Sequence, residues 1–469
     1  MKKIKGKEEY RVVNTYMEAV FTHITIPETY LGLPVTEIGT LHDYGYLKSI
    51  RIPSSIKKIS NYWSSSTSLE SIYIEDIGAW CSIEFNGYDS NPLYVGADLY
   101  LNNKLVTDLV IPDSVTTIGY AAFYNCDSLT SVVIPDSVTS IGNYAFHNCS
   151  SLTSVVIGDS VTTIGKSAFA NCRSLTSVVI GDSVTTIGEW AFNGCSRLTS
   201  VVIPDSVTSI GEWAFDDCDS LTSVVIPDSV TTIGDGAFWS CDSLTSVVIP
   251  DSVTSIGYEA FYNCNSLTEI TLPFIGTGNN AHLGYIFNAT QAEKPWEYVP
   301  KSLRKVTVTS ATSIAEHTFE NCDGLTSIVL GDSVTAIGGS AFYDCNGLTS
   351  VEVGDGVTSI GDFAFYNCNK LTSFKIGKKV TSIGDYTFFN CGSLTSIVIP
   401  SSVTTVAHSA FDGCGNLTAV YYQGNAEEWA AIDFSGANEF FTNITRYYYS
   451  ETEQSGCWHY DESGNVVLW

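Results

Sequence analysis

The chain has 469 residues, and its 50 acidic against 22 basic side chains give a formal net charge of −28 at pH 7. This excess of negative charge argues against a nucleic-acid-binding protein, which needs a basic face, and against binding to an anionic membrane surface. Because 44% of the residues are apolar and only 15% are charged, the chain can build a large core and does not belong to the disordered class.

Residues 1–104 contain irregular repeats. Leu47, Ile50 and Ile52 begin one unit of apolar spacing, but no fixed period joins it to its neighbours. Terminal repeats are atypical because they must present a polar or covered end to water. We therefore interpret this segment as degenerate N-terminal repeats and a cap. Met1–Lys5 is basic without a following apolar segment, so the chain is expected to lack a signal peptide.

Residues 105–273 repeat a unit of 23 residues, and residues 303–423 repeat it again. The copy at Leu129–Ser151 reads L-T-S-V-V-I-P-D-S-V-T-S-I-G-N-Y-A-F-H-N-C-S-S, and its positions are numbered 1 to 23 here. A cysteine at position 21 marks the period: Cys126, Cys149, Cys172, Cys195, Cys218, Cys241, Cys264, Cys322, Cys345, Cys368, Cys391 and Cys414. Such a period is typical of a solenoid, in which each unit covers the apolar face of the next.

Two parts of the unit are predicted to be extended. The run S-V-V-I at positions 3–6 is short, β-branched and ended by Pro or Gly, as expected of a strand. The run V-T-S-I-G at positions 10–14 is a second, shorter extended segment. Stacked coils would place equivalent strands about 4.8 Å apart. The predicted fold is a β-rich repeat solenoid with one long parallel sheet, short second extended segments and few helices.

Three positions of the unit are expected to have defined structural roles. Position 18 is phenylalanine in twelve units, and these rings are expected to stack in a column. Glycine at position 14 either takes a positive φ or lets neighbouring coils approach closely. Aspartate at position 8 is expected to start a turn, because its carboxylate can accept a backbone N–H two residues on.

Residues 274–302 interrupt the period and are predicted to form an insertion loop. Gly276–Ala281 matches G-x-G-x-x-A, but no helical pattern follows it, so a dinucleotide site is not expected. Residues 424–469 are predicted to form a C-terminal cap. In this cap, Asn425 is expected to be the N-cap of a short helix with acidic residues in its first turn, and a hairpin is expected to turn at Glu462–Asn465.

The motif L-x-x-V-x-I-P-x-S-V-x-x-I-G-x-x-A-F-x-N-C, present over about residues 21–423, resembles the treponemal-type leucine-rich repeat of BspA-like bacterial surface proteins. The resemblance implies a leucine-rich-repeat superhelix that is secreted or displayed on a bacterial cell. It also implies adhesion to host proteins or to other cells. An intracellular scaffold for protein–protein interaction is the alternative, which the missing signal peptide favours.

The repeated cysteines and aspartates are candidate metal ligands. All column cysteines face the same way, so we expect buried free thiols, and no close pair such as C-x-x-C provides a zinc site. No cofactor is expected. Aspartates at position 8 would repel one another, and a bound Ca²⁺ would relieve that; turn formation alone explains them, however, and no metal site is expected. They are Asp113, Asp136, Asp159, Asp182, Asp205, Asp228, Asp251, Asp332 and Asp355.

No catalytic motif is present, since the sequence contains neither H-E-x-x-H nor G-x-S-x-G. A glycosidase could use Glu189, Glu212 or Asp216, but it would need two carboxylates facing each other across a cleft. The flank of a solenoid offers no enclosed cleft. We therefore expect a protein that is not an enzyme.

Two surfaces of the solenoid are candidate binding sites for a protein or carbohydrate partner. Strand alternation points position 5 outward, where most coils carry valine and the later ones carry Glu352, Lys375 and Tyr421. This stripe is either an interaction patch or a consequence of β-propensity. Positions 15, 16 and 19 form a second surface, with Glu189, Trp190, Glu212, Trp213, Trp239 and Tyr262. Aromatic rings beside carboxylates suit sugar stacking or protein anchoring, or they form a ladder that stabilises the flank. Nucleic acid and membrane insertion are not expected.

Overall fold

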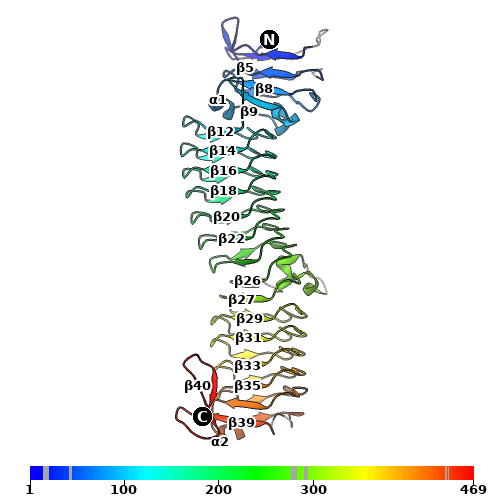
Figure 1. The fold of residues 1–469 in the computed structure, drawn as a ribbon, viewed down its shortest axis with the longest axis vertical. Coiled ribbons are helices and arrows are strands. Elements are labelled where there is room, and N and C mark those ends of the chain that lie inside the picture. Colours follow the sequence, from blue (N-terminus) through cyan, green and yellow to red (C-terminus); the bar gives the residue numbers. More distant parts are fainter. Residues whose placement is uncertain (14–20, 42–44, 276–281, 290–293, 439–440, 442) are drawn as a thin grey trace. The chain divides into compact units, whose positions relative to one another are not determined.

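The computed structural model describes residues 1–13, 21–41, 45–275, 282–289, 294–438, 441 and 443–469. Contacts divide the chain into two compact units. Unit 1 comprises Met1–Leu244 and Ser252–Cys264, and unit 2 comprises Thr245–Asp251 and Asn265–Trp469. Each unit is a solenoid of stacked β-coils (Figure 1).

Unit 1 begins with irregular coils that form two mainly parallel sheets, in the orders β1-β2-β5-β7-β9 and β11-β10-β8-β6-β3, with β4 paired to β5. Their strands are β1 (Lys2–Lys3), β2 (Tyr10–Val12), β3 (His23–Thr25), β4 (Thr29–Tyr30), β5 (Leu33–Ile38), β6 (Ser49–Arg51), β7 (Lys58–Ile59), β8 (Ser71–Ile74), β9 (Glu84–Phe85), β10 (Asp98–Leu101) and β11 (Lys104–Leu105). The short helices are α1 (Ile77–Cys81), η1 (Tyr88–Ser90) and η2 (Pro92–Val95).

The regular coils of unit 1 each contribute one longer and one shorter strand. The longer strands are β12 (Asp108–Val110), β14 (Ser131–Ile134), β16 (Ser154–Ile157), β18 (Ser177–Val179), β20 (Ser200–Val202) and β22 (Ser223–Val225). The shorter ones are β13 (Thr117–Ile118), β15 (Ser140–Ile141), β17 (Thr163–Ile164), β19 (Thr186–Ile187), β21 (Ser209–Ile210), β23 (Thr232–Ile233) and β25 (Ser255–Ile256).

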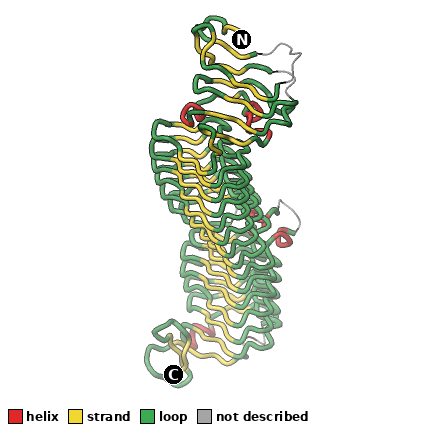
Figure 2. Tube along the Cα trace, turned by 45° about the horizontal axis from the view of Figure 1, so that its top comes forward, coloured by secondary structure: helices red, strands yellow, loops and turns green. Residues whose placement is uncertain are grey.

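Strand pairing follows the period residue for residue. Val132 of β14 pairs with Val155 of β16 in parallel, and Ile141 pairs with Ile164. The predicted solenoid is thus confirmed. The second extended segments also pair with each other, as a seven-stranded sheet from β13 to β25, whereas the longer strands form the sheets β12-β14-β16-β18 and β20-β22. Figure 2 shows the strands of successive coils aligned in rows.

Unit 2 repeats this design. Its longer strands are β24 (Ser246–Val248), β26 (Glu269–Leu272), β27 (Lys305–Val308), β29 (Ser327–Leu330), β31 (Ser350–Val353), β33 (Ser373–Lys375), β35 (Ser396–Ile399), β37 (Ala419–Tyr422) and β39 (Thr445–Tyr449). The shorter ones are β28 (Ser313–Ile314), β30 (Ala336–Ile337), β32 (Ser359–Ile360), β34 (Ser382–Ile383), β36 (Thr405–Val406) and β38 (Asp433–Phe434).

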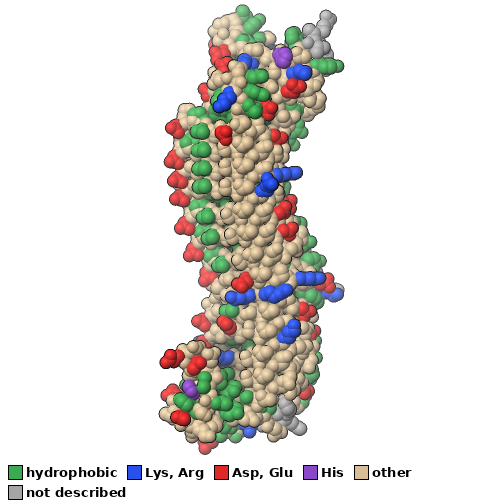
Figure 3. All heavy atoms as spheres, in the orientation of Figure 1, with side chains coloured by type: hydrophobic (Ala, Val, Ile, Leu, Met, Phe, Trp, Pro, Cys, Tyr) green, Lys and Arg blue, Asp and Glu red, His purple; other side chains and the backbone are tan. Residues whose placement is uncertain are grey.

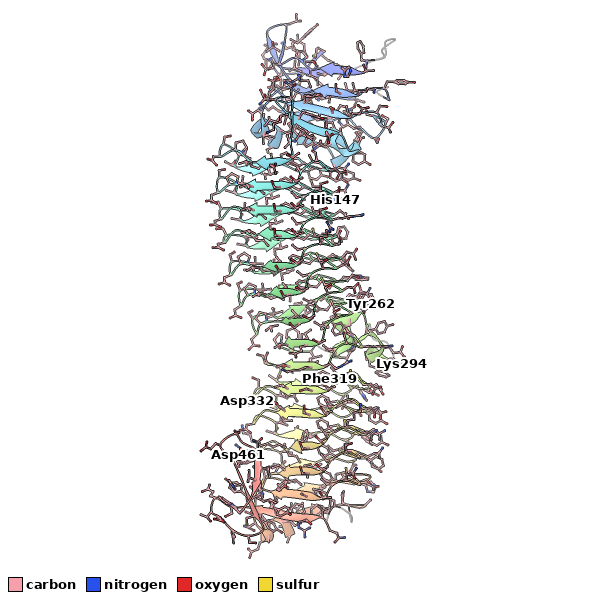
Figure 4. All side chains as sticks on the ribbon, in the orientation of Figure 1. His147, Tyr262, Lys294, Phe319, Asp332 and Asp461 are labelled. Carbon is pink, nitrogen blue, oxygen red and sulfur yellow. The ribbon has the colours of Figure 1, made fainter. Side chains whose placement is uncertain are left out.

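The insertion leaves the sheet of unit 2 uninterrupted, because β26 pairs directly with β27 through Ile270 and Val306. It contains the 3-10 helices η4 (Leu283–Phe287) and η5 (Pro295–Tyr298), and Lys294 projects from the flank of the coils (Figure 4). The G-x-G-x-x-A match at 276–281 lies outside the described residues.

The C-terminal segment contains helix α2 (Ala426–Ala430) and the strands β40 (Cys457–Tyr460) and β41 (Val466–Leu468). Asn425 is the N-cap of α2: its side chain accepts the N–H groups of Glu427 and Glu428, and the Glu428 carboxylate accepts the N–H of Asn425. The strands β40 and β41 pair in antiparallel register as a hairpin.

The core of each regular coil is built on the predicted phenylalanine column. In unit 1 these rings are fully buried and stack with centroid distances of 5.1–5.4 Å and interplanar angles of 2–7°. The neighbouring cysteines are buried free thiols, as expected. They also make a contact that was not predicted, since Cys149 Sγ donates to the carbonyl of Phe123 in the preceding coil at 3.1 Å.

Glycine at position 14 permits close approach rather than a positive φ. A Cβ added to Gly142 would lie 2.8 Å from the carbonyl carbon of Gly119 in the preceding coil. Left-handed backbone occurs instead at positions 16 and 20, as at Tyr144 with φ 59° and Asn148 with φ 58°. The side-chain amide of asparagine tolerates this conformation, which explains the asparagine before most of the cysteines.

The prediction for aspartate at position 8 was wrong about its hydrogen-bond partner. Asp136 Oδ1 accepts the backbone N–H of Asp159 at 2.8 Å, and Asp332 Oδ1 accepts that of Asp355 at 3.1 Å. In these coils the partner is therefore the equivalent residue of the next coil and not a residue two positions on. Stacking brings that N–H within reach where position 7 is glycine.

Candidate functional site

The most exposed apolar feature of unit 1 is a row of valines at position 5, here called the valine column. The strand β14 buries Val132 and Ile134, so its alternation turns Val133 outward. The parallel register repeats this from β12 to β18 and again in β20 and β22. The column is Val110, Val133, Val156, Val179, Val202 and Val225, whose side chains are 41–69% exposed.

An acidic border runs beside the valine column. It consists of the position-8 aspartates Asp113, Asp136, Asp159, Asp182, Asp205 and Asp228, all exposed. Figure 3 shows the row of apolar side chains next to the row of acidic ones. Within the described part of the chain, no lysine or arginine forms an ion pair with these six carboxylates. The surface therefore combines aliphatic contact area with unneutralised negative charge.

In the last coils of unit 2, Lys375 and Tyr421 at the same position contact the chain's own C-terminal hairpin, whereas Val248 in the first coil of this unit is 62% exposed. The Lys375 ammonium lies 4.8 Å from the ring centroid of Tyr460, and the Tyr421 ring contacts that of Trp458 at 5.8 Å. Between them Val398 is only 7% exposed. Lys375 and Tyr421, both predicted to bind a ligand, thus contact β40, whereas Glu352 is exposed.

Two hydrogen bonds fix this hairpin. Gln423 Nε2 donates to the Tyr460 hydroxyl at 2.9 Å, and the indole N–H of the buried Trp458 donates to the Tyr422 carbonyl at 3.1 Å. A position-5 column is therefore a surface on which an aromatic β-hairpin can pack. Unit 2 provides an example of this packing within the chain itself.

The aromatic flank of unit 1 divides into two groups. Trp213 contacts Trp239, and Trp239 contacts Tyr262, each with a centroid distance of 4.8 Å. Trp190 lies apart from them in a different set of contacts: the Lys166 ammonium is 4.8 Å from its ring and 2.8 Å from Glu189 Oε1. Tyr262 is labelled on this flank in Figure 4.

Local packing explains why these rings differ in exposure. Trp190 is 38% exposed, whereas Trp213, Trp239 and Tyr262 are half-buried. A Cβ at Gly236, in the next coil, would collide with the Trp213 ring, so this ring fills the space above that glycine. Trp213, Trp239 and Tyr262 stabilise one another, and Trp190 offers the freer ring face. Glu212 is exposed.

Asp216 is the carboxyl group of this flank with the most perturbed environment. Burial, and then the neighbouring Asp217, raise its pKa from 3.8 to about 7, although Asn193 Nδ2 donates to Asp216 Oδ2 at 2.8 Å. The folded state therefore binds the proton more tightly than the unfolded state. This difference in proton binding stabilises the folded state fully below pH 3.8, and the stabilisation is lost as the pH rises from there through about 7.

Asp216→Asn is therefore expected to raise the thermal unfolding midpoint most at about pH 8 and clearly less at about pH 5, where only part of the stability loss has occurred. The amide keeps an acceptor for Asn193 and removes the buried charge. Asp182→Asn, at an exposed position, is the control and should show no such pH dependence. Melting curves of both variants at both pH values test this prediction. An equal shift of the Asp216→Asn midpoint at the two pH values would contradict the raised pKa of Asp216.

The remaining candidate ligands form no metal centre in the part of the chain that the structure describes, where no three His, Cys, Asp or Glu residues group to hold an ion. Burial raises the pKa of Cys126 to about 12, so this thiol is a poor thiolate donor. Sequence reasoning missed Val110 and Lys166. Val110 was detectable, since it stands one period before Val133.

Comparison with known proteins identifies the family. Residues 12–91, 93–220, 162–282 and 301–439 match the family described as BspA type leucine rich repeat region (6 copies). No curated protein matches the sequence. Among the described residues, no helix has the length and hydropathy needed to cross a bilayer.

Two bacterial proteins of known structure are similar to the chain. One is a leucine rich cell surface protein from Faecalibacterium prausnitzii, 35% identical, with 70% of this chain and 90% of that chain covered and a TM-score of 0.35. The other is a leucine-rich repeat protein from Bacteroides ovatus, 27% identical, with 88% and 92% covered and a TM-score of 0.46. The sequence match and the repeated coils together place this chain in the BspA-type leucine-rich-repeat family.

Proposed function

We propose that this protein is a non-catalytic adhesion protein of a bacterial cell surface that binds a partner protein through the valine column of unit 1. The observation that carries the proposal is the exposure of six equivalent valines beside six unneutralised aspartates. Exposed apolar patches of this kind often mark interaction sites. Parallel pairing holds Val110, Val133, Val156 and Val179 in register, and likewise Val202 and Val225, so little ordering entropy is lost on binding.

The chemistry of the partner follows from the two rows. Aliphatic or aromatic side chains of the partner would cover the valines, as Tyr460 and Trp458 cover position 5 in unit 2. Lysine or arginine beside them would neutralise the aspartates, which increases the association rate and sets the register. A protein supplies both kinds of side chain in one segment, whereas a neutral glycan supplies neither charge nor flat aromatic area.

Surface display and the lack of catalysis are supported separately. The relative from Faecalibacterium prausnitzii is described as a cell surface protein, and we extend that location to this chain. The carboxylates considered for catalysis have structural contacts, since Glu189 pairs with Lys166 and Asp216 accepts a hydrogen bond from Asn193. Neither belongs to the lining of the cavity beside Trp296 or of the small one beside Trp80.

The double variant Val179→Lys/Val202→Lys tests the column, because it removes two central valines and repels a basic partner. On an array of purified extracellular-matrix proteins, wild type is expected to bind at least one protein. The variant should bind it at least about tenfold more weakly, which corresponds to about 1.4 kcal/mol. Binding should also weaken as ionic strength rises.

Ser177→Lys/Ser200→Lys is the matched control, since it adds the same charge to the same exposed strands without removing a valine. It is expected to retain more of the binding than the valine variant. Equal binding by wild type and the valine variant would exclude the column as the site. A wild-type protein that binds only the glycans of a combined array would contradict a protein partner.

A further inference from the structure

In unit 2 the end of the insertion and the coil that follows it line a cavity. Its volume is about 410 Å³, within the range of small-molecule sites, and it lies between residues 296–303 on one side and 321–325 on the other. Trp296, Glu297, Lys301, Asn321, Cys322 and Asp323 contribute to its lining. The valine column belongs to the other unit, so this site is independent of the proposed adhesion surface.

The cavity exists because the cysteine ladder is interrupted at this coil. In regular coils the cysteine lies three residues before the position-1 leucine, as Cys322 does before Leu325. The coil that begins at Leu303 has Pro300 at that place and lacks the A-F-x-N-C segment before it. Cys322 is 5% exposed and lines the cavity, whereas the next three cysteines of the column are at most 1% exposed.

Hydrogen bonds hold the two walls in place before any ligand binds. Arg304 Nη1 donates to the carbonyls of Lys301, Leu303 and Gly324, at 2.6, 3.0 and 3.1 Å, and so joins both walls. Asp323 Oδ1 accepts the backbone N–H and the side-chain Nδ2 of Asn346, at 3.2 and 3.1 Å. The carboxylate of this lining residue is therefore held in a fixed orientation.

Trp296 lies in a short turn that two contacts hold in place. Val299 N–H donates to the Trp296 carbonyl at 3.3 Å, and the carboxylate of the adjacent Glu297 pairs with Lys294 at 3.2 Å. A flat, half-buried indole at the wall of a preformed cavity provides apolar contact area at a small entropic cost.

The lining groups match the chemistry of a sugar. Pyranose hydroxyls both donate and accept hydrogen bonds, and the cavity supplies a donor in Lys301, acceptors in Asp323 and Glu297, and both in the Asn321 amide. The apolar C–H face of a pyranose can pack on the Trp296 ring. The Glu297 carboxylate is already paired with Lys294, and the Arg304 guanidinium is bonded to the wall carbonyls. This leaves Lys301 against Asp323 at the cavity, and such a near balance of charge favours a neutral sugar over a carboxylated or phosphorylated one.

We propose that this cavity binds one neutral pyranose unit at the end of a glycan. Saturation-transfer NMR on the full chain with the methyl glycosides of glucose, galactose, mannose, N-acetylglucosamine and N-acetylgalactosamine tests this. N-acetylneuraminic acid is the anionic comparison. At least one neutral glycoside is expected to bind, and the anionic sugar should give no saturation transfer.

Variants locate the binding. Trp296→Ala is expected to abolish saturation transfer, Trp296→Phe to retain part of it, and Asp323→Asn to weaken the affinity about tenfold, the effect of losing one hydrogen bond to a charged group. Trp190→Ala, in unit 1, is the matched control and should bind as wild type does. Retained binding by Trp296→Phe would show that Trp296→Ala loses binding because the aromatic ring is missing and not because the protein misfolds.

A glycan array tests whether the cavity binds the sugar at the end of a glycan or only as a free glycoside. Glycans that end in the sugar found by NMR should bind, and the Trp296→Ala variant should no longer bind those glycans. Absence of binding by all neutral glycosides, preference for the anionic sugar, or unchanged binding by Trp296→Ala would each overturn the proposal. Binding of the free glycoside without any glycan would overturn the assignment to a glycan end.

Discussion

Replacing Phe192 with alanine is expected to lower the free energy of unfolding by about 3–5 kcal/mol, the usual range for a buried phenylalanine. Phe192 is fully buried, and its ring lies between those of Phe169 and Phe215, each at a centroid distance of 5.4 Å. The variant therefore loses two stacking contacts and leaves a cavity between two coils. Urea denaturation followed by circular dichroism measures the loss.

Val179→Ala is the control for this prediction, because Val179 is 58% exposed on the strand β18. Its effect should stay within about 0.5 kcal/mol, as for most surface substitutions. A loss below about 1 kcal/mol for Phe192→Ala would mean that the neighbouring coils collapse into the space. The phenylalanine column would then not be the main source of cohesion between coils.

The coils and their core could be predicted from the sequence because the period alone determines which side chains stack. Phe146 and Phe169 are one period apart, and their rings lie 5.2 Å apart. The same holds for the strands, in which Val132 pairs with Val155. A 23-residue period converts a position in the sequence directly into a column in space, so no long-range contact had to be guessed.

The turns between the strands could not be predicted in this way. Tyr144, Trp190 and Trp213 all have positive φ, although bulky side chains rarely adopt that conformation. Contacts with the next coil impose it, since Trp190 N–H donates to the Glu212 carbonyl at 2.9 Å and Phe192 N–H to that of Ala214 at 2.8 Å. The conformational propensity of a single residue does not predict these hydrogen bonds, because each of them joins residues of two neighbouring coils.

The candidate sites also divide into those that the repeat period predicts and those that it does not. The outward valines followed from strand alternation, but the cover over Lys375 and Tyr421 did not, because Tyr460 and Trp458 reach them from a hairpin outside the repeat. The cavity beside Trp296 also depends on a segment without a period. Sequence reasoning therefore predicted the repeated surface and missed the sites where aperiodic segments pack on it.

The second large effect is expected from Gly361→Ala. A Cβ at Gly361 would lie 2.6 Å from the backbone nitrogen of Gly339 and 2.9 Å from the carbonyl carbon of Gly338, in the preceding coil. Backbone atoms cannot rotate away, so the two coils must separate and strain the pairing of Ile337 with Ile360 in β30 and β32. We expect a loss of stability of about 1–3 kcal/mol, the usual cost of overpacking, measured as a lower urea midpoint.

Gly392→Ala is the matched control, because Gly392 belongs to the same unit and a Cβ there would meet no atom within 4 Å. This variant should be neutral or stabilised by about 0.4–1 kcal/mol, since alanine reduces the entropy of the unfolded chain at a compatible site. The two substitutions add the same methyl group, so a difference in their urea midpoints measures how closely the coils approach at position 14. Equal midpoints would mean that neighbouring coils can separate there without cost, and glycine at that position would then need another explanation.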